Sequence, residues 1–230
     1  MHEIEVLPDG EPQEITAVEL LQRPRGRYRI YFGDPFVTVH ESTMVRYGMT
    51  KGSFFNKTSL REIISDNERQ IAYAEALNYL SFRPRTSGEV EKRLLEKEID
   101  PHAAAAVVQR LASENLIDDQ LYAKEWARQR VTNRKKGKVW VRQELKQKGI
   151  DQELIQEALD EVGDEDELSS AVDTASKKWR TTKGEVWERK RKTLAFLMRR
   201  GFSSDISRKA LEAVLQSDGA DADDLGTEFD

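Results

Sequence analysis

The stretch LKQKGIDQELIQEALDEV, residues 145–162, decides the fold of this chain. Gly149 followed by Ile150 is typical of a helix end, where glycine adopts the left-handed conformation and the next apolar residue folds back onto the helix. Asp151 is a strong N-cap for the following helix. The third, fourth, seventh, eighth and eleventh residues after this cap share one helical face, and all five are apolar. The stretch therefore predicts two consecutive helices joined by a tight turn.

The same pattern occurs twice more, with a period of about 51 residues. Residues 94–111 hold it around Asp100, and residues 197–214 hold it around Ser203. Over the three segments, fourteen of the fifteen face positions are apolar, and the exception is Ser207. Chance does not readily supply this agreement, so the pattern indicates a structural repeat.

The helix end before each cap differs in one of the three segments. Gly201-Phe202 repeats the arrangement of Gly149-Ile150, whereas Glu98-Ile99 keeps the apolar residue but lacks the glycine. We expect the helix end at Glu98 to be strained or built differently, since the left-handed conformation favours glycine.

Each repeat has a further predicted helix ahead of this pair of helices, over residues 71–80, 121–131 and 168–179. A unit of three short helices buries its apolar face only against a neighbour. The sequence thus predicts a mainly α fold whose tandem three-helix repeats form a curved solenoid. The predicted repeats span residues 67–116, 117–163 and 164–216.

Residues 1–66 predict a small α/β module instead. Three short segments are rich in β-branched and aromatic residues: ITAVELL (15–21), RYRIYF (27–32) and FVTVH (36–40). Gly33-Asp34-Pro35 separates the last two and favours a β-hairpin. A two-turn helix is expected over residues 42–48, and the capping box Ser59 to Glu62 is expected to open the next helix.

Composition excludes several classes of protein. The chain has 230 residues, of which 38% are hydrophobic, and it has no cysteine, so disulfides and thiolate metal sites are absent. It shows no signal peptide and no apolar run of about 18 residues, and we expect a cytoplasmic protein that does not enter a membrane. His2, His40 and His102 are scattered singly, and no phosphate loop, HExxH or GxSxG motif occurs. We therefore expect no catalysis, no cofactor and no metal.

The net charge of −5 is unevenly distributed. Residues 160–167 and the tail, residues 217–230, each hold six acidic residues and no basic one. Residues 121–150 and 177–200 each hold ten Lys or Arg against two Glu. One charge run is usually a solvated helix face, but two at matching places in a repeat favour a binding surface. The tail is expected to be disordered, or to screen a binding surface.

Basic connections recur between the first and second helices of each unit. They are Arg83-Pro84-Arg85, residues 130–138 and residues 183–192. Stacking of the repeats is expected to place them along one side, where they can follow phosphates or an acidic protein groove. No helix carries a base-reading set of Arg, Asn and Gln, so we expect binding without sequence specificity.

The four tryptophans allow two interpretations, core packing and base stacking. Trp126 and Trp179 fall on predicted first helices, where core packing is favoured. Trp140 and Trp187 lie near the starts of second helices. Base stacking remains open for Trp140, because Lys and Arg flank it.

Three blocks of the sequence resemble the bacterial regulatory protein RecX family. ALNYLSFRPRTSGEVEKRLLEKEI (76–99) resembles the family's opening motif. IDDQLYAKEWARQR (117–130) with KKGKVWVRQELKQKGID (135–151) resembles the second repeat, and KRKTLAFLMRRGFSSDISRKAL (190–211) is similar to the third. The hairpin-bearing start resembles the longer, Gram-positive-type members, and only the acidic tail departs from the pattern.

The resemblance implies a modulator of RecA, the recombinase that polymerises with ATP on single-stranded DNA. Family members are understood to lie in the groove of the RecA filament and to restrain its growth, ATP hydrolysis and strand exchange. The implied partners are the RecA filament and single-stranded DNA, bound by a monomer. The candidate contacts are Arg83, Arg85, Arg130, Arg134, Lys135, Lys136, Lys138, Arg142, Lys190 and Lys192.

Two other functions fit parts of the sequence. A DNA-binding helical protein that acts without RecA would bind duplex DNA tightly and with a sequence preference. A helical adaptor for peptides would bind independently of salt, whereas phosphate contacts lower log affinity by roughly 0.7 per contact for each unit of log salt on single strands.

Overall fold

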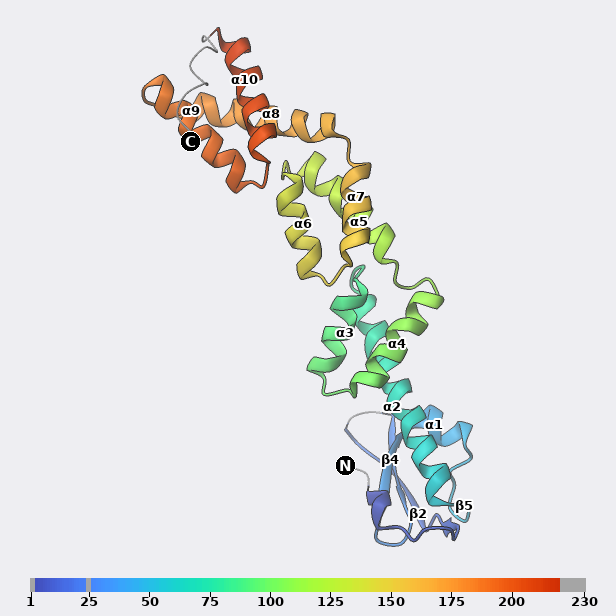
Figure 1. Ribbon diagram of the computed structural model, residues 1–230. Helices are drawn as coiled ribbons and strands as arrows, with labels where there is room; N and C mark the ends of the chain where they lie inside the picture. The colour runs from blue at the N-terminus through green and yellow to red at the C-terminus, as the bar shows by residue number, and fades with distance from the viewer. Residues whose placement is uncertain (1–2, 24–25, 220–230) are drawn as a thin grey trace. The chain divides into compact units, whose positions relative to one another are not determined.

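The structure is a computed structural model that describes residues 3–23 and 26–219 (Figure 1). Strands occur only near the start of the described chain, and helices form the rest. In chain order the elements are η1 (Glu3–Val6), β1 (Gln13–Glu14), β2 (Ala17–Leu20), β3 (Arg27–Tyr31), β4 (Phe36–His40), α1 (Glu41–Arg46), β5 (Phe54–Phe55), α2 (Lys57–Leu80), α3 (Ser87–Glu96), α4 (Pro101–Ser113), α5 (Asp119–Arg128), η2 (Gln129–Asn133), α6 (Lys138–Gln147), α7 (Gln152–Glu161), α8 (Asp164–Thr181), α9 (Val186–Arg199) and α10 (Ser204–Asp218).

The chain folds into two compact units. Unit 1 comprises Met1–Arg85 and Val90–Ile117, and unit 2 comprises Thr86–Glu89 and Asp118–Asp230. α10 continues through Asp218, two residues into the segment that was predicted to be a disordered tail. Residues 220–230 of that segment lie outside the described residues.

The predicted hairpin in unit 1 is confirmed. β3 pairs with β4 in antiparallel register from Arg27↔His40 to Tyr31↔Phe36, and β2 adds a third antiparallel strand. At the turn, the N–H of Phe32 donates to the carbonyl of Pro35 over 2.8 Å. The alternate residues Val37 and Val39 of β4 are buried, and Ile30 is the buried residue of β3.

α2 is one helix from the module into the first repeat (Figure 1). Its N-cap is Asn56, whose side chain accepts from the N–H of Ser59 over 2.7 Å. The prediction that Ser59 opens this helix is therefore wrong, because Ser59 already lies in the first turn. Leu60 is buried in the core of the module, and Ala76 is buried in the core of the repeat. The predicted boundary between residues 66 and 67 falls inside this helix, and the division into five segments stays a prediction.

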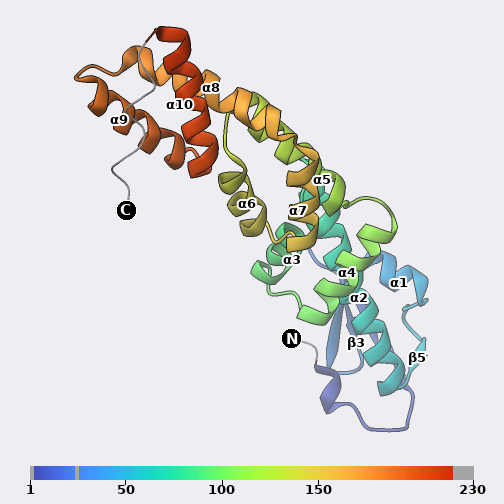
Figure 2. The ribbon, with the colours of Figure 1, turned by 45° about the horizontal axis from the view of Figure 1, so that its top comes forward.

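The tandem three-helix repeats are confirmed (Figure 2). The second half of α2 with α3 and α4 forms the first repeat, α5 to α7 form the second, and α8 to α10 form the third. The predicted caps Asp100, Asp151 and Ser203 directly precede α4, α7 and α10. Asp100 and Ser203 accept backbone N–H groups with their side chains, whereas the Asp151 side chain makes no capping hydrogen bond.

The face after each cap packs toward the core as predicted, with Val108, Leu154 and Ile206 half-buried and one polar exception in the third repeat. Ser207 is fully buried at a position where the other repeats have Ala104 and Ile155. Its hydroxyl has no hydrogen-bond partner among the described residues. The periodicity therefore decided the burial of this position, whatever the polarity of its side chain.

The three helix ends before the caps share one geometry. Gly149 and Gly201 have φ of +78° and +86°, and Glu98 takes the same left-handed conformation with φ of +59°. In each case the following apolar residue donates its N–H to a leucine carbonyl over 3.2 Å, Ile99 to Leu94 being the first. The end at Glu98 is therefore the same motif, formed without the residue that it favours.

We expect Glu98→Gly to stabilise unit 1 by roughly 0.5 to 1 kcal/mol. Relief of the left-handed conformation contributes about 1 to 2 kcal/mol, and the greater freedom of glycine in the unfolded chain offsets part of it. The measurement is urea denaturation followed by circular dichroism. Glu91→Gly, in the interior of α3 and exposed, is the control and is expected to lose about 1 kcal/mol. A loss of stability in both variants would contradict the assignment.

Candidate nucleic-acid interface

The connection between α5 and α6 carries a dense group of cations in unit 2. α5 continues into η2, a π-helical turn in which the N–H of Arg134 donates to the carbonyl of Gln129 over 3.2 Å. Val131 of this turn is buried, and its carbonyl accepts from the hydroxyl of Ser170 on α8 over 2.9 Å. The turn is thus anchored in the core, and of the cations that follow it Arg134 is exposed while Lys135, Lys136 and Lys138 are half-buried.

The C-terminal end of α9 holds the same connection from a second side. The guanidinium of Arg200 donates to the carbonyls of Arg134 and Lys135 over 2.7 and 3.0 Å. The carbonyl of Arg200 accepts in turn from the N–H of Gly137 over 3.0 Å. The backbones meet so closely that a Cβ on Gly137 would lie 2.1 Å from the carbonyl oxygen of Gly201. The cations therefore stand on a connection that packing holds in place.

A buried carboxylate closes the start of α6. Glu167 of α8 is 4% exposed, and its Oε1 accepts from the N–H of Lys138 over 2.8 Å. Burial raises the pKa of Glu167, although this hydrogen bond and the charge of Lys138 act in the opposite direction. At the start of α3, the carboxylate of Asp119 likewise accepts from the N–H of Ser87 over 2.8 Å, and burial raises the pKa of Asp119. The start of α6 is thus occupied from within the protein.

We expect Glu167→Gln to stabilise unit 2 by about 1 kcal/mol at about pH 7 and to have little effect at about pH 4. The amide keeps an oxygen for the N–H of Lys138 but removes the buried charge. Because the folded-state pKa of Glu167 lies above its ordinary value of 4.5, the folded state binds the proton more tightly than the unfolded chain. The wild-type protein therefore loses stability as pH rises from 4.5 through the raised value.

The measurement is urea denaturation of both proteins at the two pH values. Glu165→Gln is the control, since Glu165 lies in the same turn of α8 and is exposed. An effect of Glu167→Gln that is equal at both pH values would contradict the buried charge as its cause.

At least four of the ten predicted contact residues form ion pairs within the part of the chain that the structure describes. The acidic partner of Lys138 is Asp164, which belongs to the acidic run 160–167. These pairs reduce the share of the cations that is available to an outside anion. The four pairs are Arg130–Glu144 at 2.8 Å, Lys135–Asp173 at 3.0 Å, Lys138–Asp164 at 2.7 Å and Lys192–Glu188 at 3.2 Å.

Arg130 and Glu144 belong to a structural network. Glu144 also accepts from Nε1 of Trp126 over 3.0 Å, and the Arg130 guanidinium lies 3.9 Å from the centre of the Trp126 ring. Burial would raise the pKa of Glu144, but hydrogen bonds from Trp140, Arg130 and Trp126 lower it overall. Arg130 therefore orders the second repeat as well as adding charge to its surface.

The other candidates are unequally placed. Lys190 is only 6% exposed, so little of it reaches the surface. Arg142 is exposed and donates to the amide oxygen of Gln156 over 2.8 Å. Arg83 and Arg85 lie in unit 1 between α2 and α3, and Arg85 packs over the Tyr79 ring at 4.1 Å. The prediction that all the basic connections share one side concerns both units and stays a prediction.

The structure brings Arg130, Arg134, Lys136 and Arg200 together, and we call them the α6 cationic cluster. Lys136 is half-buried, with its Nζ 3.6 Å from the centre of the Trp140 ring. Burial lowers the pKa of Lys136, and the charges of Arg200 and Arg130 lower it further, against the effect of Glu144. Arg134 is exposed and has no ion pair among the described residues. The cluster is a site of positive potential suited to an anion.

Arg200 of the cluster and a structural ion pair of Lys148 were not predicted from the sequence. Arg200 precedes Gly201, and a cation in the last turn before a left-handed glycine was a usable signal. Lys148 forms an ion pair with Glu89 over 2.8 Å in which both side chains are largely buried, and it belongs to the architecture of unit 2. No local pattern of the sequence indicated that pair.

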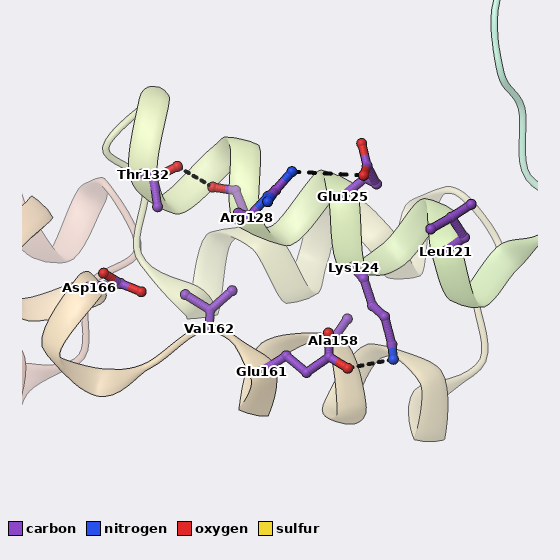
Figure 3. A pocket seen from close by; sticks show the side chains of 9 residues that line it. All are labelled: Leu121, Lys124, Glu125, Arg128, Thr132, Ala158, Glu161, Val162 and Asp166. Carbon is purple, nitrogen blue, oxygen red and sulfur yellow. Dashed lines mark hydrogen bonds and ion pairs between the residues drawn. The ribbon is translucent and has the colours of Figure 1, made fainter.

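A separate groove between α5 and α7 does not suit an anion (Figure 3). It has a volume of about 300 Å³. Lys124 pairs across it with Glu161, and Arg128 lies 3.8 Å from Glu125. Its cations are thus engaged inside the groove. The lining residues are Leu121, Lys124, Glu125, Arg128, Thr132, Ala158, Glu161, Val162 and Asp166.

Neither a metal site nor a membrane-spanning helix is found in the described residues. In residues 3–23 and 26–219, no group of three His, Asp or Glu side chains is placed to hold a metal ion. None of the helices in these ranges has both the length and the apolarity that a membrane span requires.

Family models match all three repeats. The model described as RecX, first three-helix domain, matches residues 72–111. The models for the second and third three-helix domains of RecX match residues 118–159 and 164–211. The matched segments follow the repeats seen in the structure.

Similar proteins cover most of the chain. The regulatory protein RecX of Bacillus cytotoxicus is 30% identical over 206 residues, which are 87% of this chain and 76% of the relative. That of Listeria welshimeri is 27% identical over 215 residues, 92% of this chain and 80% of the relative. A crystal structure of a regulatory protein RecX aligns with a TM-score of 0.65 and 30% identity, over 84% of this chain and 96% of that one. The crystal structure of RecX from Lactobacillus salivarius aligns with a TM-score of 0.61 and 28% identity, over 65% and 97%.

Proposed function

Because this chain belongs to the family of the regulatory protein RecX, we propose that it modulates RecA, mainly as an inhibitor. It binds in the groove of the filament that RecA forms on single-stranded DNA and restrains filament growth, ATP hydrolysis and strand exchange. It acts in the cytoplasm as a monomer, by binding and without catalysis.

The observation that carries this proposal is the α6 cationic cluster. The connection that bears it is anchored by Val131 in the core and clamped by Arg200 from α9. The lowered pKa of Lys136 reflects burial and the neighbouring cations, and an approaching phosphate offsets both the burial and the repulsion. A rigid positive surface of this kind binds a nucleic-acid backbone at little conformational cost.

The same arrangement supports binding without sequence preference. The cations of the cluster come from a connection and from the end of α9, and no single helix presents them as a set. Contacts of Arg and Lys with phosphates position a protein on nucleic acid but do not read its bases. The protein is therefore suited to a filament that forms on any single strand.

The test is the ATPase activity of RecA on single-stranded DNA, with this protein added at increasing ratios. We expect a lower rate at substoichiometric amounts, because one protein in the groove acts on several RecA subunits. An unchanged rate at an equimolar ratio would argue strongly against the proposal.

Electron microscopy of the filaments separates this function from DNA binding without RecA. Added density in the filament groove supports the proposal. Bare filaments, together with tight and sequence-dependent binding to duplex DNA, favour a DNA-binding protein that acts independently of RecA.

A further inference from the structure

Trp187, near the start of α9, differs from the other tryptophans in its exposure. Trp187 is 56% exposed, Trp140 is 37% exposed and Trp179 is 1% exposed, while Trp126 is half-buried. A large aromatic surface in contact with water is unfavourable unless a partner covers it. The exposure of Trp187 therefore calls for an explanation that the core does not supply.

The other three rings have structural partners. Nε1 of Trp179 donates to Asp218 over 2.7 Å, and Nε1 of Trp126 donates to Glu144 over 3.0 Å. Trp140 packs against the backbone of Gly201. A Cβ added to Gly201 would lie 2.3 Å from the Cβ of Trp140. Within the described residues, the indole N–H of Trp187 makes no hydrogen bond, and the one cation over its ring is Arg191, at 5.4 Å from the centre. Trp187 therefore makes fewer stabilising contacts within the described residues than the other three tryptophans do.

The surroundings of Trp187 are strongly basic. Residues 177–192 contain eight Lys or Arg and two Glu. Glu188 pairs with Lys192 over 3.2 Å, so its charge is largely neutralised. Lys183 and Arg191 are exposed and form no ion pair among the residues that the structure describes. Lys183 and Arg191 lie four residues before and four residues after Trp187 in the sequence, and both remain available to a ligand.

Arg189, on the same helix, has a structural role that differs from the exposed position of Arg191. Its guanidinium turns inward, lies 3.8 Å from the centre of the Trp179 ring and donates to the Trp179 carbonyl over 3.1 Å. Arg191, two residues later on the other side of the helix, stays with Trp187. The helix thus uses one arginine for the core and leaves the other beside the exposed ring.

We propose that Trp187, with Lys183 and Arg191, is a stacking site for an unpaired base of single-stranded nucleic acid. The indole stacks on the base, and the two cations contact the flanking phosphates. Isolated aromatic rings among cations are the elements from which proteins build such platforms. This inference rests on the proposed function and adds to it a named contact with the strand itself.

Two other ligands fit this surface less well. An amphipathic helix that lies on a membrane needs an apolar stripe, but Leu194 and Leu197 of α9 pack in the core of the third repeat. A peptide-binding site needs a concave apolar lining, and the groove found in unit 2 is lined by α5 and α7 residues instead. An exposed flat ring with Arg191 over it and a further cation four residues earlier in the sequence suits a base.

The test uses the full chain without RecA and an oligothymidylate of about 30 nucleotides. Affinity is measured by the anisotropy of labelled oligonucleotide, and stacking is measured by quenching of tryptophan fluorescence. We expect Trp187→Ala to bind about 5-fold to 100-fold more weakly. The binding free energy lost with one stacked base corresponds to a change in affinity of about this range. Trp187→Phe is expected to bind within about threefold of the wild type, but to lose most of the quenching. A duplex of equal length is expected not to quench, because its bases are already stacked.

Met198→Ala is the matched control, since Met198 is 51% exposed on the same helix and is not aromatic. The stacking site is overturned if Trp187→Ala binds like the wild type, or if Met198→Ala loses as much affinity. A response of the indole to anionic vesicles but not to the oligonucleotide also overturns it, in favour of a membrane surface.

The RecA ATPase assay keeps the two proposals distinguishable. In one outcome, the wild type inhibits RecA and the Trp187→Ala variant binds the oligonucleotide as well as the wild type does. This outcome contradicts the stacking site and leaves the proposed function standing. In the other outcome, the Trp187→Ala variant loses affinity for the oligonucleotide, but the wild type does not change the RecA ATPase rate. This outcome supports the stacking site and contradicts the proposed function.

Discussion

Replacing Gly201 with alanine is expected to lower the free energy of unfolding of unit 2 by about 2 to 4 kcal/mol. The residue has φ of +86°, where an alanine is strained by roughly 1 to 2 kcal/mol. The added Cβ would also lie 2.5 Å from the backbone nitrogen of Trp140, which cannot move aside as a flexible side chain would. Overpacking of this kind destabilises by typically 1 to 3 kcal/mol. Urea denaturation followed by tryptophan fluorescence measures the loss.

Gly219→Ala separates the two causes. Gly219 ends α10 with φ of +71°, and an added Cβ would meet no atom within 4 Å. It therefore carries the backbone strain alone, and we expect a loss of only about 1 kcal/mol. Equal losses at Gly219 and Gly201 would show that the close approach to Trp140 has no energetic weight.

The same close approach occurs a second time in unit 2. A Cβ on Gly88 would lie 2.8 Å from the Cα of Gly149, and a Cβ on Gly149 would lie 2.9 Å from the Cα of Gly88. Gly88 is the second residue of α3, whereas Gly137 is the N-cap of α6, and Gly149 and Gly201 follow the ends of α6 and α9. Paired glycines let two backbones touch where any side chain would separate them.

Reversing two charges of the α6 cationic cluster is expected to weaken inhibition of RecA by about 100-fold or more in the concentration for half-inhibition. The variant is Arg134→Glu with Lys136→Glu, which leaves the clamping residue Arg200 in place. Both side chains are directed to solvent or to a ring rather than to a carboxylate, so their loss breaks no ion pair. Each lost phosphate contact also reduces the slope of log affinity against log salt by about 0.7 on single strands.

Arg208→Glu with Lys209→Glu is the matched control. These residues are exposed on α10, and their reversal changes the net charge by the same amount. Of the two, Lys209 alone has an acidic partner among the described residues, Asp205 at 2.8 Å. We expect this variant to keep inhibition within about threefold, since neither residue belongs to the α6 cationic cluster and the charge of an exposed side chain is screened by salt. Equal weakening by both variants would show that net charge matters and that the cluster is not the contact. Thermal denaturation confirms that both variants remain folded.

The starts of α4, α7 and α10 were predictable from residues in their own first turns. A capping side chain and an apolar face are written within about a dozen residues, so Asp100 and Ser203 indicated their helices without knowledge of the rest. The hairpin of β3 and β4 was predictable for the same reason, since its turn residues adjoin its strands. The start of α2 was not, because Asn56 and Ser59 both suit a cap and packing of the helix onto the sheet settles the choice.

The candidate site divides in the same way. That cations gather in residues 121–150 and 177–200 was visible in the sequence. Which of them face outward was not, because Lys138 finds Asp164 and Lys135 finds Asp173 only once α6 and α8 are packed in one unit. Arg200 reaches the α5–α6 connection across 65 residues of sequence. Helix starts and apolar faces follow from preferences of neighbouring residues along the chain, whereas pairing and exposure follow from which surfaces meet in space, and only tertiary packing decides that.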